Sequence, residues 1–394
     1  MEKISNIKHN ILIISFTVFV FLWDVTLFNF NLKFLILFTY ILVILDYKKF
    51  INKFYDYKLL IFLFIFIHLY VSSEFSLSFY LVKTYIFLFL ISYLVIFYKD
   101  EILLILEKSI YLFYLILILI FIFHIIFSKN YVNLNSLTDF FTLKKILFIE
   151  NSHFAMISTS IMIYSLNELV IKNKIIYLFV FLLTLSIAYL NFSLSFFAGI
   201  FLSCSFIIIT NYLSLKKLQI TAFILLMVIS VISIYANSKS FHKIKTLKEN
   251  TTKNLNQKKI DLSVDVFLTS YKVMINSLKE KPFGYGFNNY EKAFNMHINK
   301  IDTKHTLTPF LNKQDGSNNF VKIVTETGVF SLIIVYFVIF FAFSNKINLH
   351  YKLLIIPNFL VQSFFRGAGY FNGGYIIYLL LIILLVLDNE FKKN

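Results

Sequence analysis

The chain has 394 residues, a mean hydropathy of +0.77 and only 15% charged residues, which excludes a soluble globular protein. Its apolar residues come in runs of roughly 15 to 25, long enough for a helix to cross a bilayer, so a multi-pass helical membrane protein is expected. The net charge of +16 on such a chain does not indicate a nucleic-acid partner. The single cysteine, Cys204, excludes an internal disulfide, and no cluster of Cys and His residues indicates a metal site.

Twelve apolar runs predict an all-α fold with about twelve transmembrane helices. They cover residues 10–24, 27–45, 58–74, 78–98, 102–127, 153–171, 175–190, 195–212, 218–236, 319–343, 352–365 and 371–388. With the amino terminus inside, the short inner segments hold 16 lysines, whereas the short outer segments hold 6 lysines or arginines. This distribution follows the positive-inside rule and predicts that both termini are cytoplasmic.

The spans divide the chain into three parts: residues 1–236 with nine spans, a polar segment at 237–318, and residues 319–394 with three spans. The polar segment carries 14 lysines and 7 acidic residues, and by parity it is an external loop. Within it, residues 262–278 place apolar side chains near helical spacing. They predict an amphipathic helix that lies on the bilayer or on the helix bundle.

Glycine and proline are concentrated in the last third of the chain. Eight of the nine glycines and all three prolines follow residue 280. Because these residues punctuate regular structure, we expect the irregular backbone of a site there.

Two stretches of the polar segment form the most informative pattern. Residues 281–290 read KPFGYGFNNY, and residues 315–329 read DGSNNFVKIVTETGV and enter the tenth predicted span. This order, with the overall layout, resembles the family of O-antigen ligases and O-antigen polymerases. The resemblance implies integral membrane glycosyltransferases with a GT-C-like reaction, which use glycans linked to a lipid diphosphate.

The second stretch has the features of a site at a helix start. Asn318, Lys322 and Glu326 are four residues apart, so they share one face of a helix whose amino-terminal end points outward. That end suits a diphosphate or a sugar hydroxyl, and Glu326 is a candidate catalytic residue. Alternatively, Glu326 pairs with Lys322 and only stabilises the helix.

Arg366 is the only arginine of the chain and lies at the outer end of the eleventh predicted span, before several glycines. Its guanidinium matches phosphate oxygens, which makes it a candidate for binding the diphosphate. The alternative is an interfacial anchor. Members of the family generally use several external arginines, so the remaining charge is expected from lysines, with Lys281, Lys313 and Lys322 as candidates.

Residues 150–155, ENSHFA, open the sixth predicted span and resemble a stretch of several polysaccharide polymerases. Glu150 and His153 are candidates for a general base and its orienting partner. They could equally form a helix cap with Asn151 or Ser152. Further residues expected to bind or shape the glycan are Gly284, Gly286, Asn288, Asp315, Asn318, Asn319 and Tyr370.

Within the family, the ligase signature requires a histidine directly before the Asn of the closing motif, and this chain has Ser317 or Asn318 there. This favours a Wzy-type polymerase over a ligase. The resemblance implies donor and acceptor glycans on undecaprenyl diphosphate, a location in the bacterial inner membrane and no metal or other cofactor. A chain-length regulator is a further expected partner. A lipid-linked oligosaccharide flippase and a non-enzymatic membrane subunit are the alternatives from other classes.

Overall fold

The structure is a computed structural model, and it describes residues 2–21, 26–27, 30–31, 41, 44, 46–56, 89–90, 92–94, 96–98, 101–127, 151–172, 174–191, 194–211, 217–236, 262–344 and 349–367. The chain divides into two compact units. The first comprises residues Met1–Ile157 and Phe371–Leu380, and the second comprises Ser158–Tyr370 and Leu381–Asn394. The three parts predicted from topology remain a prediction.

The first unit contains the helices α1 (Glu2–Phe21), α3 (Tyr47–Asp56) and α6 (Ile102–Phe127), and the short strands β1 (Thr26–Leu27) and β2 (Phe30–Asn31). The long apolar helices α1 and α6 pack against each other. The two strands form an antiparallel pair in which Thr26 lies opposite Asn31. The described fold is therefore helical apart from this one small ribbon.

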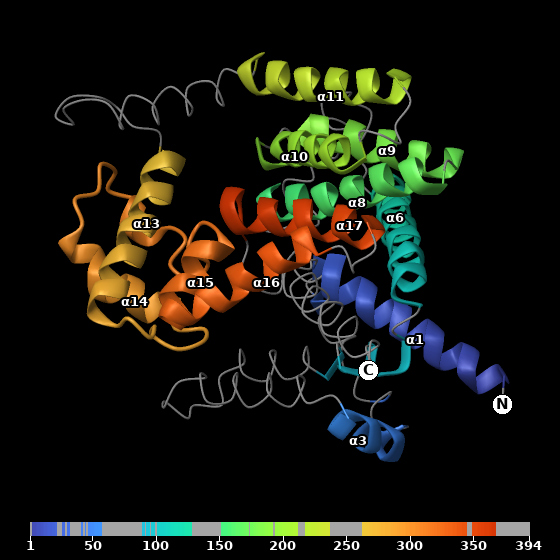
Figure 1. Cartoon of the computed structure of the whole chain (residues 1–394), viewed down its shortest axis with the longest axis horizontal. Coiled ribbons are helices and arrows are strands. Elements are labelled where there is room, and N and C mark those ends of the chain that lie inside the picture. The colour runs from blue at the N-terminus through green and yellow to red at the C-terminus, as the bar shows by residue number, and fades with distance from the viewer. Residues whose placement is uncertain are drawn as a thin grey trace. The chain divides into compact units, whose positions relative to one another are not determined.

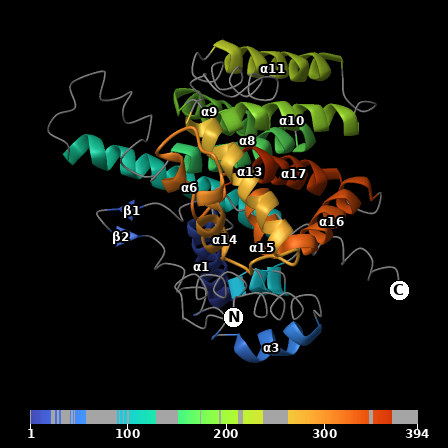
Figure 2. The same cartoon turned by 90° about the vertical axis from the view of Figure 1, so that its left-hand side faces the viewer.

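The second unit begins with a layered group of apolar helices, α8 (Asn151–Lys172), α9 (Ile175–Asn191), α10 (Leu194–Asn211) and α11 (Lys217–Ala236). The helix α17 (Leu349–Leu360) joins this group from the end of the described chain. Figures 1 and 2 both show α10 between α11 and α17, and α10 contacts both helices. Their shared core contains Phe196, Phe197, Cys204 and Leu353.

Residues 262–318 of the polar segment and the helix that follows them form a folded element. Its helices are α13 (Leu262–Glu280), α14 (Tyr290–His297), the 3-10 turns Ile298–Lys300 and Thr308–Phe310, and α15 (Asn319–Thr327). Figures 1 and 2 show α13 and α14 beside α15. Val273, Phe294 and Val321, one from each helix, are fully buried among them. The structure has a helix where sequence analysis expected one at 262–278, and α13 buries one face against α14 and α15. That this helix lies on the bilayer or on the helix bundle stays a prediction.

The stretch 319–343, predicted as the tenth span, is not one continuous helix, and whether it crosses the membrane stays a prediction. The chain leaves α15 at Gly328, which has a positive φ of 56°, makes the 3-10 turn Gly328–Phe330 and continues as α16 (Ser331–Phe343). Every described residue of α15 from Val321 to Thr327 is buried, whereas α16 exposes large apolar side chains such as Leu332 and Tyr336. The break is not evident in the sequence, because α16 is apolar and the apolar run continues past Gly328.

Among the residues that the structure describes, no helix is both long enough and apolar enough to cross a membrane. The number of spans, about twelve, stays a prediction.

Candidate active site

The start of α15 is fixed by the side chain of Asn318. Its Oδ1 accepts a hydrogen bond from the backbone N–H of Val321 (2.8 Å), and its Nδ2 donates to the hydroxyl of Tyr271 on α13 (3.1 Å). Asparagine is a preferred N-cap because its oxygen satisfies a backbone donor that the helix leaves free. Asn318, which sequence analysis placed at a glycan site, is completely buried and holds α15 against α13.

The residues directly before α15 form a tight and unusual turn. The N–H of Asn318 donates to the carbonyl of Gly316 (2.7 Å), which closes a three-residue turn around Ser317 with a φ of 64°. A non-glycine residue in this region is uncommon, and turns of this kind store strain. The hydroxyl of Ser317 lies 2.8 Å from that of Ser270 and accepts from Asn312 Nδ2 (3.1 Å), and these contacts hold the turn in place.

The glycine-rich stretch 281–290 closes the opposite end of α15. The N–H of Tyr285 donates to the carbonyl of Thr325 (3.1 Å), and the N–H of Gly286 donates to that of Glu326 (2.9 Å). Gly284 has a φ of 87°, and a Cβ there would lie 2.2 Å from the carbonyl oxygen of Glu326. The two stretches of the sequence motif therefore meet in space, and Gly284 and Gly286 shape the end of the helix.

Glu326 has a structural contact at the start of α14. Its Oε1 accepts the backbone N–H of Tyr290 (3.1 Å), and the residue is completely buried. A carboxylate at this position stabilises the amino-terminal end of a helix. Burial, together with the nearby charge of Glu326, raises the pKa of Tyr290. The catalytic role of Glu326 stays a prediction. Its contact with the N–H of Tyr290 favours a structural role, in which it caps α14.

Each of the three lysines predicted to bind the diphosphate contacts a different neighbouring group. The amine of Lys322 donates to the carbonyl of Gln314 (2.7 Å) and lies 3.8 Å from a carboxylate oxygen of Asp315. Lys281 covers the ring of Tyr285, and Lys313 covers the ring of Phe310. The buried Lys322, with Asp315, thus braces the turn before α15.

Arg366 is brought to the start of α15. The chain leaves α17 through one π-helical turn, Val361–Phe365, and the N–H of Gly367, which follows Arg366, donates to the carbonyl of Ser317 (3.3 Å). The rings of Phe364 and Phe320 also contact each other beside this junction in a tilted arrangement, with centroids 5.0 Å apart. The structure therefore joins two features that sequence analysis had identified separately.

Gly367 packs directly on Asn319, the first residue of α15. A Cβ at Gly367 would lie 2.4 Å from the backbone nitrogen of Asn319 and 2.5 Å from its Oδ1. The amide group of Asn319 is buried, and neither of its polar atoms has a hydrogen-bond partner among the residues described. Because buried amides are almost always bonded, this group is suited to a ligand that enters beside Arg366.

The remaining candidates cannot be placed at this site. Glu150 and Tyr370 lie outside the described residues, and His153 lies in the first turn of α8, where its side chain is not described. Asn288 has a positive φ of 62° and lies half-buried in the turn before α14. Within the described part of the chain, no group of His, Cys, Asp and Glu residues could hold a metal ion.

Asp265 is an organising residue that sequence analysis missed. Its Oδ2 accepts the backbone N–H groups of Lys304 (2.9 Å) and His305 (3.0 Å) and the hydroxyl of Thr308 (2.6 Å). These partners lie about 40 residues further along the chain, and no local pattern indicates them. The carboxylate fixes the irregular segment before α15 to the first turn of α13.

These observations define a helical protein in which the folded polar segment ends at the start of α15. This helix start contacts Gly367, which follows the only arginine of the chain. Residues 179–336, about two fifths of the chain, match the family model described as O-Antigen ligase. The chain thus contains the domain of the O-antigen ligase and polymerase family, which confirms the resemblance seen in the motif. Members of this family are multi-pass proteins of the inner membrane that transfer glycans.

The match covers α10, α11 and the whole folded polar segment, and it ends before Arg366 and begins after residues 150–155. No curated protein and no solved structure matches the chain.

Proposed function

We propose that the protein polymerises oligosaccharide repeat units carried on undecaprenyl diphosphate, at the outer face of the bacterial inner membrane. The observation that carries this proposal is the contact of Gly367, the residue after Arg366, with the start of α15. A diphosphate bound at the positive end of this helix would suit the neighbouring arginine, because a guanidinium matches phosphate oxygens. The family match supports a lipid-linked glycan as the molecule that brings this diphosphate.

In the proposed reaction, a sugar hydroxyl of the next lipid-linked unit attacks the anomeric carbon of the growing glycan. The bond between that carbon and the diphosphate oxygen breaks, the diphosphate departs on its lipid, and a base takes the hydroxyl proton. Arg366 stabilises the negative charge that grows on the leaving diphosphate. Asn319 is positioned to bind a polar group of the substrate, since its amide is buried beside Gly367.

The polymerase is favoured over a ligase by the residue before the Asn of the closing motif. Ser317 occupies this position, and its hydroxyl is engaged with Ser270 and Asn312. A serine hydroxyl held by a hydroxyl and an amide lacks the basic nitrogen of an imidazole, so it is a poor substitute for the histidine of the ligase signature. A flippase would not require the folded polar segment that closes on α15.

Deletion of the gene followed by lipopolysaccharide electrophoresis tests the proposal. We expect lipid A core capped with a single repeat unit and no ladder, because ligase and flippase still act. Expression of the intact chain should restore the ladder. Loss of the single-repeat band as well would indicate a ligase or a flippase, and an unchanged ladder would exclude all three.

A further inference from the structure

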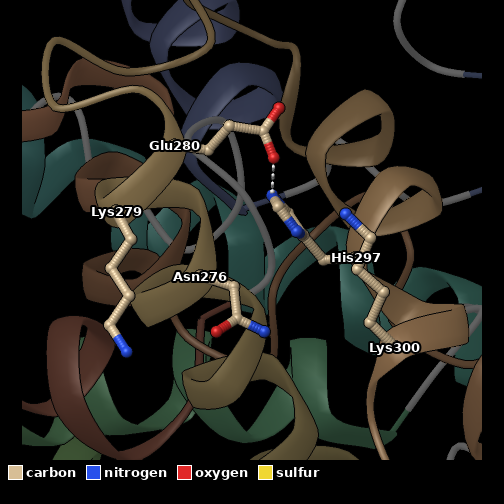
Figure 3. Close-up of a pocket in the computed structure, with 5 residues that line it drawn as sticks. All are labelled: Asn276, Lys279, Glu280, His297 and Lys300. Carbon is tan, nitrogen blue, oxygen red and sulfur yellow. Dashed lines mark ion pairs between the residues drawn. The ribbon is translucent and has the colours of Figure 1, made fainter.

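A hollow of about 350 Å³ lies away from Arg366, between the last turn of α13 and the end of α14. Asn276, Lys279 and Glu280 line it from α13, and His297 and Lys300 line it from the other side. Figure 3 shows Asn276, Glu280 and His297 around its centre, with the amine of Lys300 beside His297. Lys279 lies at its margin, with its amine turned away from Glu280. Its volume is at the lower end of the range for small-molecule sites.

The acidic side of the hollow is already engaged. Glu280 Oε2 lies 3.6 Å from Nε2 of His297, and the hydroxyl of Tyr285 lies 3.0 Å from the same nitrogen. Burial lowers the pKa of His297, the charge of Glu280 opposes this shift and the charge of Lys300 adds to it, so the neutral imidazole is favoured. Glu280 and His297 therefore line one side of the hollow, and the carboxylate of Glu280 adds one negative charge to it.

The two lysines provide the opposite and larger charge. Within the described part of the chain, neither Lys279 nor Lys300 makes a hydrogen bond or an ion pair. Each ends a helical segment, where a cation is favourable, and their amines remain available to a ligand. With Glu280 counted, the hollow carries a net charge of about +1.

We propose that this hollow binds a sugar that carries a carboxylate, such as a hexuronic acid, within the glycan that the protein handles. Lys300, with Lys279 at the margin, binds the carboxylate, and the amide of Asn276 and the carboxylate of Glu280 bind ring hydroxyls. Hydroxyl groups both donate and accept, so this mixture of donors and acceptors fits them. The proposal rests on the proposed function, because it specifies the class of glycan substrate.

Binding to the purified full-length protein in nanodiscs tests this inference without any reaction. The probes are tri-galacturonate, the neutral trisaccharide maltotriose and inorganic phosphate, each measured by titration calorimetry. We expect the wild-type protein to bind tri-galacturonate, and binding to weaken at least about tenfold in the K279A/K300A double variant, since two charge-assisted contacts are lost. The matched control is Lys272→Ala, which removes an exposed lysine of α13 outside the hollow and should leave affinity unchanged.

Equal affinity for maltotriose, no binding of tri-galacturonate by the wild-type protein, or the same loss in Lys272→Ala would overturn the inference. Phosphate that binds as tightly as tri-galacturonate would also overturn the inference, because equal affinities would indicate a general anion site. The proposed function fails separately, if gene deletion leaves the ladder unchanged. If gene deletion abolishes the ladder but the protein does not bind tri-galacturonate, only the inference about the hollow is refuted, and the proposed function stands.

Discussion

The backbone N–H of Gly367 donates to the carbonyl oxygen of Ser317 at 3.3 Å, although these residues are 50 positions apart in the chain. Ser317 belongs to the strained turn before α15, and Gly367 follows Arg366. The contact ties the position of the arginine to the helix start.

Gly367→Ala should separate the two segments. The added Cβ would lie 2.4 Å from the backbone nitrogen of Asn319, which belongs to a capped helix and cannot yield easily. We expect loss of the polysaccharide ladder with normal protein abundance in the membrane, measured by electrophoresis and immunoblotting. A full ladder from this variant would show that the close approach of Gly367 is not needed for activity.

Glu326→Gln distinguishes a helix cap from a catalytic carboxylate. Glutamine keeps an oxygen that can accept the N–H of Tyr290, so we expect the ladder to persist and the melting temperature to change little. Glu326→Ala leaves that donor buried without its acceptor and should destabilise the protein by about 1 to 3 kcal/mol. A stable Gln variant without a ladder would instead support the catalytic role of Glu326.

Asp265→Ala should loosen the segment before α15. The substitution removes three hydrogen bonds, two of them to backbone N–H groups, and we expect a loss of about 3 kcal/mol in stability. Hydrogen exchange should rise across residues 301–311. Asp302→Ala is the control, because its carboxylate is exposed and pairs with the side chain of Lys304. Similar exchange in both variants would contradict the role of Asp265.

The stability of the folded polar segment should fall in acid through His297. Burial lowers the pKa of this imidazole in the folded state, while Glu280 opposes the shift and Lys300 and the Tyr285 hydroxyl also face the ring. The unfolded chain binds the proton more readily, so stability is full above a pH of about 6.5 and declines below it. Melting temperatures at pH 7.5 and 5.5 should differ more for the wild-type protein than for His297→Gln. A smaller difference in the wild-type protein would contradict this sign.

Sequence reasoning predicted the parts of the fold that depend on local pattern. The helix α13 follows from apolar spacing, and the match of residues 179–336 confirms the family that the KPFGYG and NNFVKIVTETG stretches indicated. Periodicity could not reveal the break at Gly328, because α15 and α16 are both apolar on at least one face. The local sequence does not show that α15 is a buried helix of the folded polar segment and not the first part of a membrane span.

The site was predicted in part, for a similar reason. Residue type indicated Arg366 and the start of α15, but their contact spans about 50 residues and depends on the π-helical turn after α17. Spacing alone suggested that Glu326 serves chemistry or pairs with Lys322, and it did not indicate that Glu326 accepts the N–H of Tyr290. Long-range partners of this kind, like those of Asp265, follow from tertiary packing.

The most direct test of the central claim is the ladder produced by Arg366 variants at equal membrane abundance. If Arg366 binds the diphosphate and stabilises its developing charge, Arg366→Ala should lose about 2 to 4 kcal/mol of transition-state stabilisation and leave only the single-repeat band. Arg366→Lys keeps the charge without the forked contact and should give a shortened, weak ladder. A normal ladder from a stable Arg366→Ala protein would contradict the account and leave Arg366 an interfacial anchor.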